Sequence, residues 1–225
     1  MHTTREFVHF ITTKNYRLNY EVLLAFMGAT AVLAISPGPD NIYVLTQSIS
    51  NGKKYGFATV AGLISGCLIH ITLLAFGVSA IIKQNETLFF VLKLFGAMYL
   101  LYLAFQVFRS SAAIKISEND SSKKGLLQLF KQGFIMNVLN PKVSIFFLAF
   151  FPGFLFSQEL NTIVQFYILG FLFMLVSTLV FGVIVVLSDL ISKYIRTSTR
   201  VGVFLKWLQI IVFVGIAIYL LLSDK

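Results

Sequence analysis

Ile35-Ser36-Pro37-Gly38-Pro39-Asp40-Asn41 is a polar, helix-breaking stretch inside an otherwise apolar run from Val22 to Ile49. Hydrocarbon offers no water to the backbone groups that a broken helix leaves free. Such a break survives at membrane depth only where protein or an aqueous cavity covers it. A carboxylate there costs about 2.5–3.5 kcal/mol on insertion scales, and leucine would pack better. The position of Asp40 therefore predicts a pathway for a polar solute.

The composition is typical of a membrane protein. Hydrophobic residues make up 57% and charged residues 12% of the 225 residues, and the mean hydropathy is +0.85. In soluble domains charged residues alone reach about 25%. The net charge of +9 comes from basic residues in short loops. These loops lack the interleaved aromatic residues that a protein uses to bind a nucleic-acid strand. We expect the lipid bilayer as a partner, and no nucleic acid.

Several classes of function are disfavoured by the residue inventory. Cys67 is the only cysteine, which excludes an intrachain disulfide, a Cys-pair metal site and the thiol electron carriers. No HExxH, P-loop or GxSxG arrangement is present. Residues 1–20 carry charges and no continuous apolar core, unlike a secretory signal peptide. We expect no enzyme activity, no catalytic residue, no metal site and no cofactor.

Six segments are candidates for membrane-spanning helices, which need about 20 mostly apolar residues. They are roughly 22–49, 57–82, 88–108, 128–156, 162–187 and 203–222, and the first and fourth are interrupted. The polar stretch from Ser110 to Lys124 divides them into two sets of three. The predicted organisation is an N-terminal extension (1–20), a first three-helix repeat (21–109), a polar linker (110–125) and a second three-helix repeat (126–225).

The two sets resemble each other in outline. Each opens with a helix interrupted by proline and asparagine, and each closes with a Leu/Tyr-rich helix. Since three spans per half is an odd number, two copies must lie in opposite orientations, as in the inverted repeats of many secondary transporters. The predicted fold is an all-α integral membrane protein with six transmembrane helices in two inverted three-helix repeats.

Basic loop residues predict the orientation, because Lys and Arg favour the cytoplasmic side. One side holds nine of them, namely Lys53, Lys54, Arg109, Lys115, Lys123, Lys124, Lys193, Arg196 and Arg200. The other side holds five, namely Arg5, Lys14, Arg17, Lys83 and Lys225. This difference predicts that both termini lie outside the cytoplasm.

The first break combines several helix-breaking features. Pro37 and Pro39 lack amide donors and disfavour helix at the preceding residue, and Gly38 frees the backbone. Asp40 and Asn41 can cap a helix that restarts here. The alternative is a simple kink with a capping aspartate, but a cap at the interface would need no double proline. We therefore favour a carboxylate that faces the pathway and exchanges protons.

The second break holds Asn137, Asn140, Pro141 and Lys142. Pro141 fits the first turn of a new helix, with Asn140 as its cap and residues 143–156 as its body. A helix N-terminus inside a membrane attracts anions through its free amides and its macrodipole.

Lys142 adds a full positive charge at this break, unless its side chain reaches the membrane surface instead. The more specific hypothesis is that the two breaks together form a binding site for a zwitterion. Its ammonium group would lie near Asp40, and its carboxylate near Asn140 and Lys142.

Gly62 and Gly66 lie four residues apart on the second segment, and His70 follows one turn later on the same face. Small residues at this spacing let helices approach closely. We favour packing within the chain over a dimer seam, which leaves a homo-oligomer open. His70 could shuttle protons, but a lone histidine in a helix is more often a packing residue. Weaker candidates of the same kind are Gln47, Lys93 and Gln165.

Four motifs occur together: Ser36-Pro37-Gly38-Pro39-Asp40-Asn41, Asn51-Gly52-x-x-x-Gly56, Ala61-Gly62-Leu63-x-x-Gly66 and Gly133-Phe134-x-x-Asn137-x-x-Asn140-Pro141-Lys142. Over about residues 20–222 the chain resembles the LysE/RhtB family of amino-acid exporters. The resemblance implies proton-driven efflux of amino acids (small neutral, homoserine- or threonine-like, or basic) across the bacterial inner membrane. The extension 1–18 departs from the family, whose members begin almost at the first span.

Two other functions fit some of these residues. A channel or metal-ion transporter of related architecture would need several carboxylates within the spans, and Asp40 is nearly alone there. A non-transporting scaffold that uses the face of Gly62 and Gly66 predicts that neutralising Asp40 changes nothing.

Overall fold

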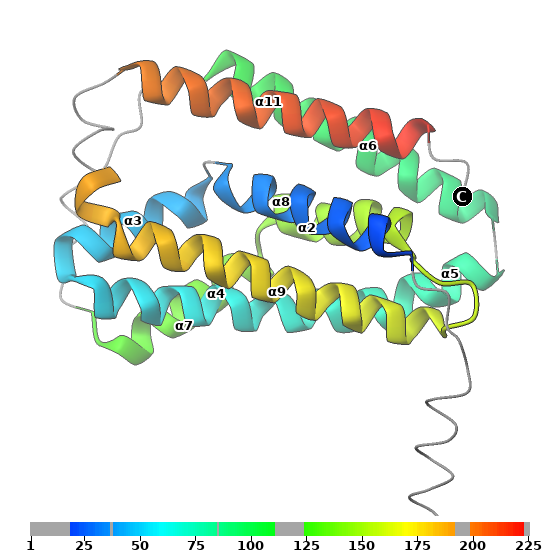
Figure 1. Ribbon diagram of the computed structural model, residues 1–225, viewed down its shortest axis with the longest axis horizontal. Coiled ribbons are helices and arrows are strands. Elements are labelled where there is room, and N and C mark those ends of the chain that lie inside the picture. The colour runs from blue at the N-terminus through cyan, green and yellow to red at the C-terminus, as the bar shows by residue number, and fades with distance from the viewer. Residues whose placement is uncertain (1–18, 37, 85, 111–123, 192–198, 223–225) are drawn as a thin grey trace, which may run out of the picture.

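The computed structural model describes residues 19–36, 38–84, 86–110, 124–191 and 199–222. Pro37, residues 1–18 of the predicted extension and residues 111–123 of the predicted linker lie outside the described residues. Every regular element in the described ranges is helical (Figure 1). These elements are α2 (Tyr20–Ile35), α3 (Pro39–Asn51), α4 (Lys53–Leu73), the π-helix η1 (Leu74–Val78), α5 (Ser79–Gln84), α6 (Glu86–Arg109), α7 (Leu126–Val138), α8 (Pro141–Ile145), the π-helix η2 (Phe146–Phe150), the 3-10 helix η3 (Phe151–Phe154), α9 (Thr162–Val186) and α11 (Thr199–Leu222).

Long apolar helices give the molecule its membrane character. Within the described residues, four segments are long and apolar enough to cross a membrane alone: Lys53–Ile81, Thr87–Arg109, Thr162–Val186 and Gly202–Leu222. Two bent pairs qualify together. α2 and α3 meet at 61°, and Leu126–Val138 meets Pro141–Phe154 at 49°. If each bent pair is one span, the described part of the chain crosses six times. The bent pairs are the two segments that the sequence predicts as interrupted.

Successive segments run in alternating directions (Figure 1). One end of the molecule carries the turn between α3 and α4, the end of α6 and the start of α7 and of α11. The basic residues Lys53, Lys54 and Arg109 belong to these parts. The opposite end carries the start of α2, the start of α9 and the end of α11. Of the other basic residues predicted for the first end, Lys115, Lys123, Lys193 and Arg196 lie outside the described residues.

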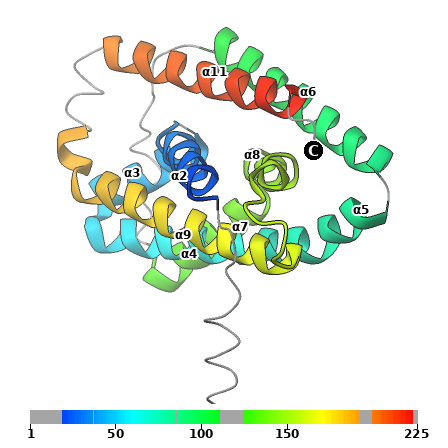
Figure 2. The ribbon, with the colours of Figure 1, turned by 45° about the vertical axis from the view of Figure 1, so that its right-hand side comes forward.

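One part of each broken span, α2 or α8, occupies the middle of the molecule. α2 and α8 lie between α4, α7 and α9 on one side and the paired α6 and α11 on the other (Figure 2). Many large apolar side chains point outward from the surrounding helices, including Leu175 and Leu179 of α9 and Leu222 of α11. Apolar surface of this kind suits lipid, because lipid tails are as apolar as leucine.

Glycines allow α4 and α7 to pack closely. A Cβ atom on Gly62 would overlap the carbonyl oxygen of Phe130, and one on Gly133 would overlap the carbonyl oxygen of Thr59. A Cβ atom on Gly66 would lie 2.8 Å from the Asn137 side chain. Because α7 of the same chain covers Gly62 and Gly66, this face is not available to a second copy.

Two spans contain interruptions of the α-helix that the sequence does not predict. In the second span, η1 separates α4 from α5. In the fourth, the predicted helix body after Pro141 is wrong in part, since only α8 is α-helical and η2 and η3 follow it. Pro152 stands in the first turn of η3, where its missing amide removes a donor that a continuing α-helix would use.

Candidate functional site

Asn140 joins the two breaks. Its Nδ2 donates to Asp40 Oδ2 at 2.6 Å, and its Oδ1 accepts from the backbone N–H of Lys142 at 3.1 Å. The predicted cap of α8 is therefore confirmed, with Pro141 at the first helical position. The same amide also holds a carboxylate that lies 100 residues earlier in the chain. Asp40 and Asn140 are both buried, so the bond between the broken spans is shielded from solvent.

Lys142 makes a second connection between the breaks. Its Nζ donates to the carbonyl oxygens of Ser36 at 3.3 Å and Leu33 at 3.5 Å, at the end of α2. It also lies 5.5 Å from the centroid of the Phe213 ring of α11. The ammonium group thus points into the protein rather than to the surface. It is near enough to Asp40 for the two charges to interact, although no ion pair joins them directly in the described chain.

The start of α3 differs from the prediction. Gly38 is its N-cap, Pro39 stands in its first turn, and no side chain caps it. The prediction that Asp40 or Asn41 caps α3 is wrong. Pro39 already supplies the fixed φ and the missing amide that suit the first helical position, so the capping position moves back to Gly38. Asn41 Nδ2 instead donates to the carbonyl oxygen of Ala34 at 2.7 Å and closes the end of α2.

A cavity of about 40 Å³ lies at this junction and is called the central cavity below. Four predicted site residues line it: Asp40, Asn41, Asn137 and Lys142. The rest of its wall consists of Leu33, Ala34, Leu63, Ile64, Cys67, Val143, Phe173, Ser177 and Phe181. The structure therefore brings residues from both breaks to one cavity, with α4 and α9 closing its sides.

Three buried polar atoms of the cavity-lining residues have no hydrogen-bond partner within the described chain. They are Asp40 Oδ1, Asn137 Oδ1 and Ser177 Oγ. An unpaired buried polar group costs about 1–3 kcal/mol of stability. Three of them on the walls of one cavity are what a ligand with several hydrogen-bond donors requires.

Ser177 is the site residue that sequence reasoning missed. It stands in a nearly uniformly apolar span, beside another small polar residue, Thr178. Thr178 Oγ1 donates to the carbonyl oxygen of Met174 at 2.7 Å, within its own helix. Ser177 Oγ makes no such bond. The sequence cannot distinguish the two, because a hydroxyl bonded to its own helix and one facing a cavity look alike in it.

Residues 31–224 match the family model described as LysE type translocator. The chain belongs to the LysE family of translocators. Similar relatives are the homoserine/homoserine lactone efflux proteins of Salmonella typhi and Salmonella typhimurium, each 31% identical over 190 residues. These alignments cover 84% of this chain and 86% of each relative. No solved structure matches the chain. Membership confirms the resemblance and identifies a multi-pass membrane transporter rather than an enzyme.

In this LysE translocator, His70 supports the site without lining the central cavity. Its Nε2 lies 3.2 Å from the carbonyl oxygen of Asn137, and its ring stacks on Phe147 with centroids 5.4 Å apart. Since a carbonyl oxygen only accepts, Nε2 is the protonated nitrogen and donates. His70 therefore holds the end of α7, next to the Asn137 side chain that faces the cavity.

Gln165 has a structural role. Its Oε1 accepts from the backbone N–H groups of Phe156 and Ser157 at 2.8 and 2.9 Å. Its Nε2 donates to the carbonyl oxygens of Ser157 and Leu160 at 2.8 and 2.9 Å. All four bonds hold the turn between η3 and α9.

The two other weak candidates also lie away from the central cavity lining. Gln47 Oε1 accepts from Asn51 Nδ2 at 2.8 Å, one turn later in α3. Lys93 Nζ lies 5.8 Å from the centroid of the Phe89 ring, within α6.

Proposed function

We propose that this translocator exports small neutral amino acids and related primary amines, such as homoserine, from the cytoplasm across the bacterial inner membrane. The central cavity carries the proposal. It combines one carboxylate, Asp40, and one ammonium group, Lys142, with unpaired acceptors at the meeting point of two broken spans. No second carboxylate lines it in the described chain, which favours a neutral over a basic side chain on the solute.

The unpaired atoms match a primary ammonium group. Such a group has three N–H donors, and Asp40 Oδ1, Asn137 Oδ1 and Ser177 Oγ offer three acceptors. Asp40 also supplies the opposite charge, and hydrogen bonds to charged groups contribute about 1.5–3 kcal/mol. We therefore assign the solute ammonium to these three residues.

Lys142 would bind a solute carboxylate. Two of its three donors are taken by the carbonyl oxygens of Leu33 and Ser36, which leaves one for the solute. α8 has five residues, so its macrodipole is small and Lys142 supplies most of the positive charge.

The solutes named for the Salmonella relatives support this division. Homoserine and homoserine lactone both carry a primary ammonium group, whereas only homoserine has a free carboxylate. An ammonium seat at Asp40 would serve both solutes, and the Lys142 contact would serve homoserine alone.

Export requires the walls of the central cavity to move. A volume of about 40 Å³ holds roughly three water molecules at 10–15 Å³ each, which is too little for an amino acid. We propose that the halves 21–109 and 126–225 are inverted repeats that rock about the bends of 61° and 49°. Asp40 would take up a proton when the site faces outward, and would release it to the cytoplasm when the next solute ammonium binds from that side.

The test is efflux of labelled homoserine and of labelled homoserine lactone from cells loaded with each. Asp40→Asn should slow efflux of both solutes, since both need its charge. Lys142→Met should slow homoserine efflux more than lactone efflux. Matched controls are Asp189→Asn and Lys54→Met, which neutralise exposed groups outside the cavity lining. An uncoupler should slow efflux of both solutes.

Full efflux of both solutes in Asp40→Asn would refute the ammonium seat. An equal loss for both solutes in Lys142→Met would limit Lys142 to holding the end of α2.

A further inference from the structure

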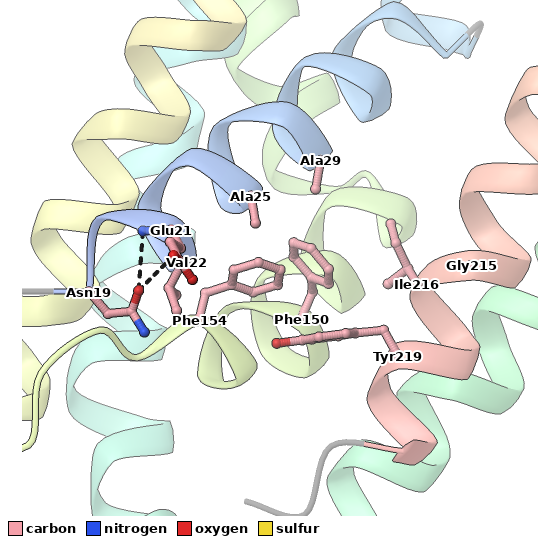
Figure 3. A pocket seen from close by; sticks show the side chains of 10 residues that line it. All are labelled: Asn19, Glu21, Val22, Ala25, Ala29, Phe150, Phe154, Gly215, Ile216 and Tyr219. Carbon is pink, nitrogen blue, oxygen red and sulfur yellow. Dashed lines mark hydrogen bonds between the residues drawn. The ribbon is translucent and has the colours of Figure 1, made fainter.

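A second, larger cavity lies between α2, η2–η3 and α11 (Figure 3). Its volume is about 440 Å³, within the range of small-molecule sites. Val22, Ala29 and Phe150 contribute to its mostly apolar wall, and Asn19 and Glu21 stand at the start of α2. Glu21 is exposed, and a carboxylate avoids lipid. This cavity, called the outer cavity below, therefore has its charged edge toward water.

One face of α2 connects the two cavities. Val22, Phe26, Ala29 and Leu33 recur at intervals of three and four residues, which places them on one side of a helix. Val22 and Ala29 line the outer cavity, and Leu33 lines the central cavity. The opposite wall is also shared, because α8 lines the central cavity and η2–η3 line the outer one.

Packed aromatic rings stand on the two walls that the cavities share. This aromatic barrier consists of Phe26, Phe146, Phe150 and Phe154. The ring centroid of Phe150 lies 4.4 Å from that of Phe146, 4.3 Å from that of Phe154 and 6.3 Å from that of Phe26. All four side chains are buried. Phe150 and Phe154 line the outer cavity, whereas Phe26 and Phe146 line neither cavity.

Thr30 is a polar residue at the level of this layer. It follows Ala29 on α2, is fully buried, and its Oγ1 has no hydrogen-bond partner. Thr30 lines neither cavity, so its hydroxyl is not assigned to the solute path.

We propose that the outer cavity is the second half of the solute path, and that the aromatic barrier is the closed gate between it and the central cavity. The inference rests on the proposed function. The solute is the same primary amine, which leaves Asp40, passes the aromatic barrier and meets the Glu21 carboxylate. Since the start of α2 lies opposite the end with the basic turns, the predicted orientation makes the outer cavity the release side.

Two glycines provide a matched test of the path. Gly215 lines the outer cavity and Gly28 of α2 does not, and a Cβ atom on either meets nothing within 4 Å. The first side-chain atom therefore fits at both positions, and the two Gly→Leu variants are compared at equal amounts of inserted protein. Gly215→Leu should lower labelled homoserine efflux about tenfold or more, because its side chain fills space that the solute needs. Gly28→Leu should keep the wild-type rate.

A second pair tests the gate. Phe150→Ala opens a hole in the aromatic barrier, whereas Phe166→Ala truncates an equally buried phenylalanine outside the barrier and outside both cavity linings. Labelled homoserine should leak down its gradient through vesicles with Phe150→Ala, and not through those with Phe166→Ala. Both variants are compared at equal amounts of inserted protein.

Equal efflux in Gly215→Leu and Gly28→Leu, with no extra leak in Phe150→Ala, would overturn the path and the gate. If Asp40→Asn still slowed efflux in that case, the proposed function would hold without the proposed path and gate. A wild-type protein that exports no homoserine would overturn both.

Discussion

The bond between Asn140 and Asp40 makes a quantitative prediction about stability. The Asn140 side chain makes two hydrogen bonds, one to the Asp40 carboxylate and one from the Lys142 backbone. Loss of a helix cap costs about 1 kcal/mol, and loss of a hydrogen bond to a charged group about 1.5–3 kcal/mol. Asn140→Ala should therefore lower the free energy of unfolding by roughly 2.5–4 kcal/mol.

A double-mutant cycle separates the two contributions. In an Asp40→Ala background the carboxylate is already absent, so Asn140→Ala should cost only the cap, about 1 kcal/mol. The coupling energy between the two positions should then be about 1.5–3 kcal/mol. Unfolding in mixed detergent micelles can be followed by the fluorescence of Trp207, the only tryptophan.

Additive effects would refute this reasoning. If Asn140→Ala has the same cost in both backgrounds to within about 0.5 kcal/mol, the usual error of additivity, the bond does not stabilise the protein. Asn140→Ser serves as a control, because serine keeps the cap but is too short to replace the amide donor to Asp40. It should show the full coupling loss with little of the cap loss.

Three further predictions concern single residues. Ser177→Ala should leave the free energy of unfolding unchanged or slightly higher, because its hydroxyl has no partner, yet it should weaken homoserine binding about tenfold in calorimetry; weaker folding with unchanged binding would contradict this. Gly133→Ala should cost about 1–3 kcal/mol in the unfolding assay, because its Cβ would overlap the carbonyl oxygen of Thr59, whereas Gly182→Ala meets nothing within 4 Å and should be neutral or stabilising. Gln165→Leu removes four hydrogen bonds, which at about 0.5–1.5 kcal/mol each sum to roughly 2–6 kcal/mol of unfolding free energy; a loss below that range would show that the turn before α9 is held by other contacts.

Residues that disturb an apolar pattern could be identified from the sequence. Asp40, Asn140 and Lys142 stand out because charge and proline within hydrocarbon-length segments are costly. Their type and spacing also predict the break of each span and the cap of α8. What they meet across the fold depends on packing between distant segments, and the sequence alone does not contain it.

Other parts of the site could not be predicted, for identifiable physical reasons. Ser177 shows no signal because a single hydroxyl hardly changes the hydropathy of its span. The cap of α3 was mispredicted because Pro39 competes with Asp40 for the start of the helix. The π-helices η1 and η2 lie in apolar stretches that contain no proline or charge, so their sequence is typical of an ordinary α-helix.

The five residues of α8 have a consequence for leakage. Asn140 and Lys142 flank its first residue, and they secure α3 and α2 respectively. A solute ammonium at Asp40 Oδ1 would draw on the same carboxylate charge as the Asn140 amide at Oδ2, and so would weaken the bond that holds α3. Without a solute, the bond between Asn140 and Asp40 stays intact and holds the two broken spans together. Asp40 would therefore both bind the solute and restrain the conformational change of a transporter that carries no solute.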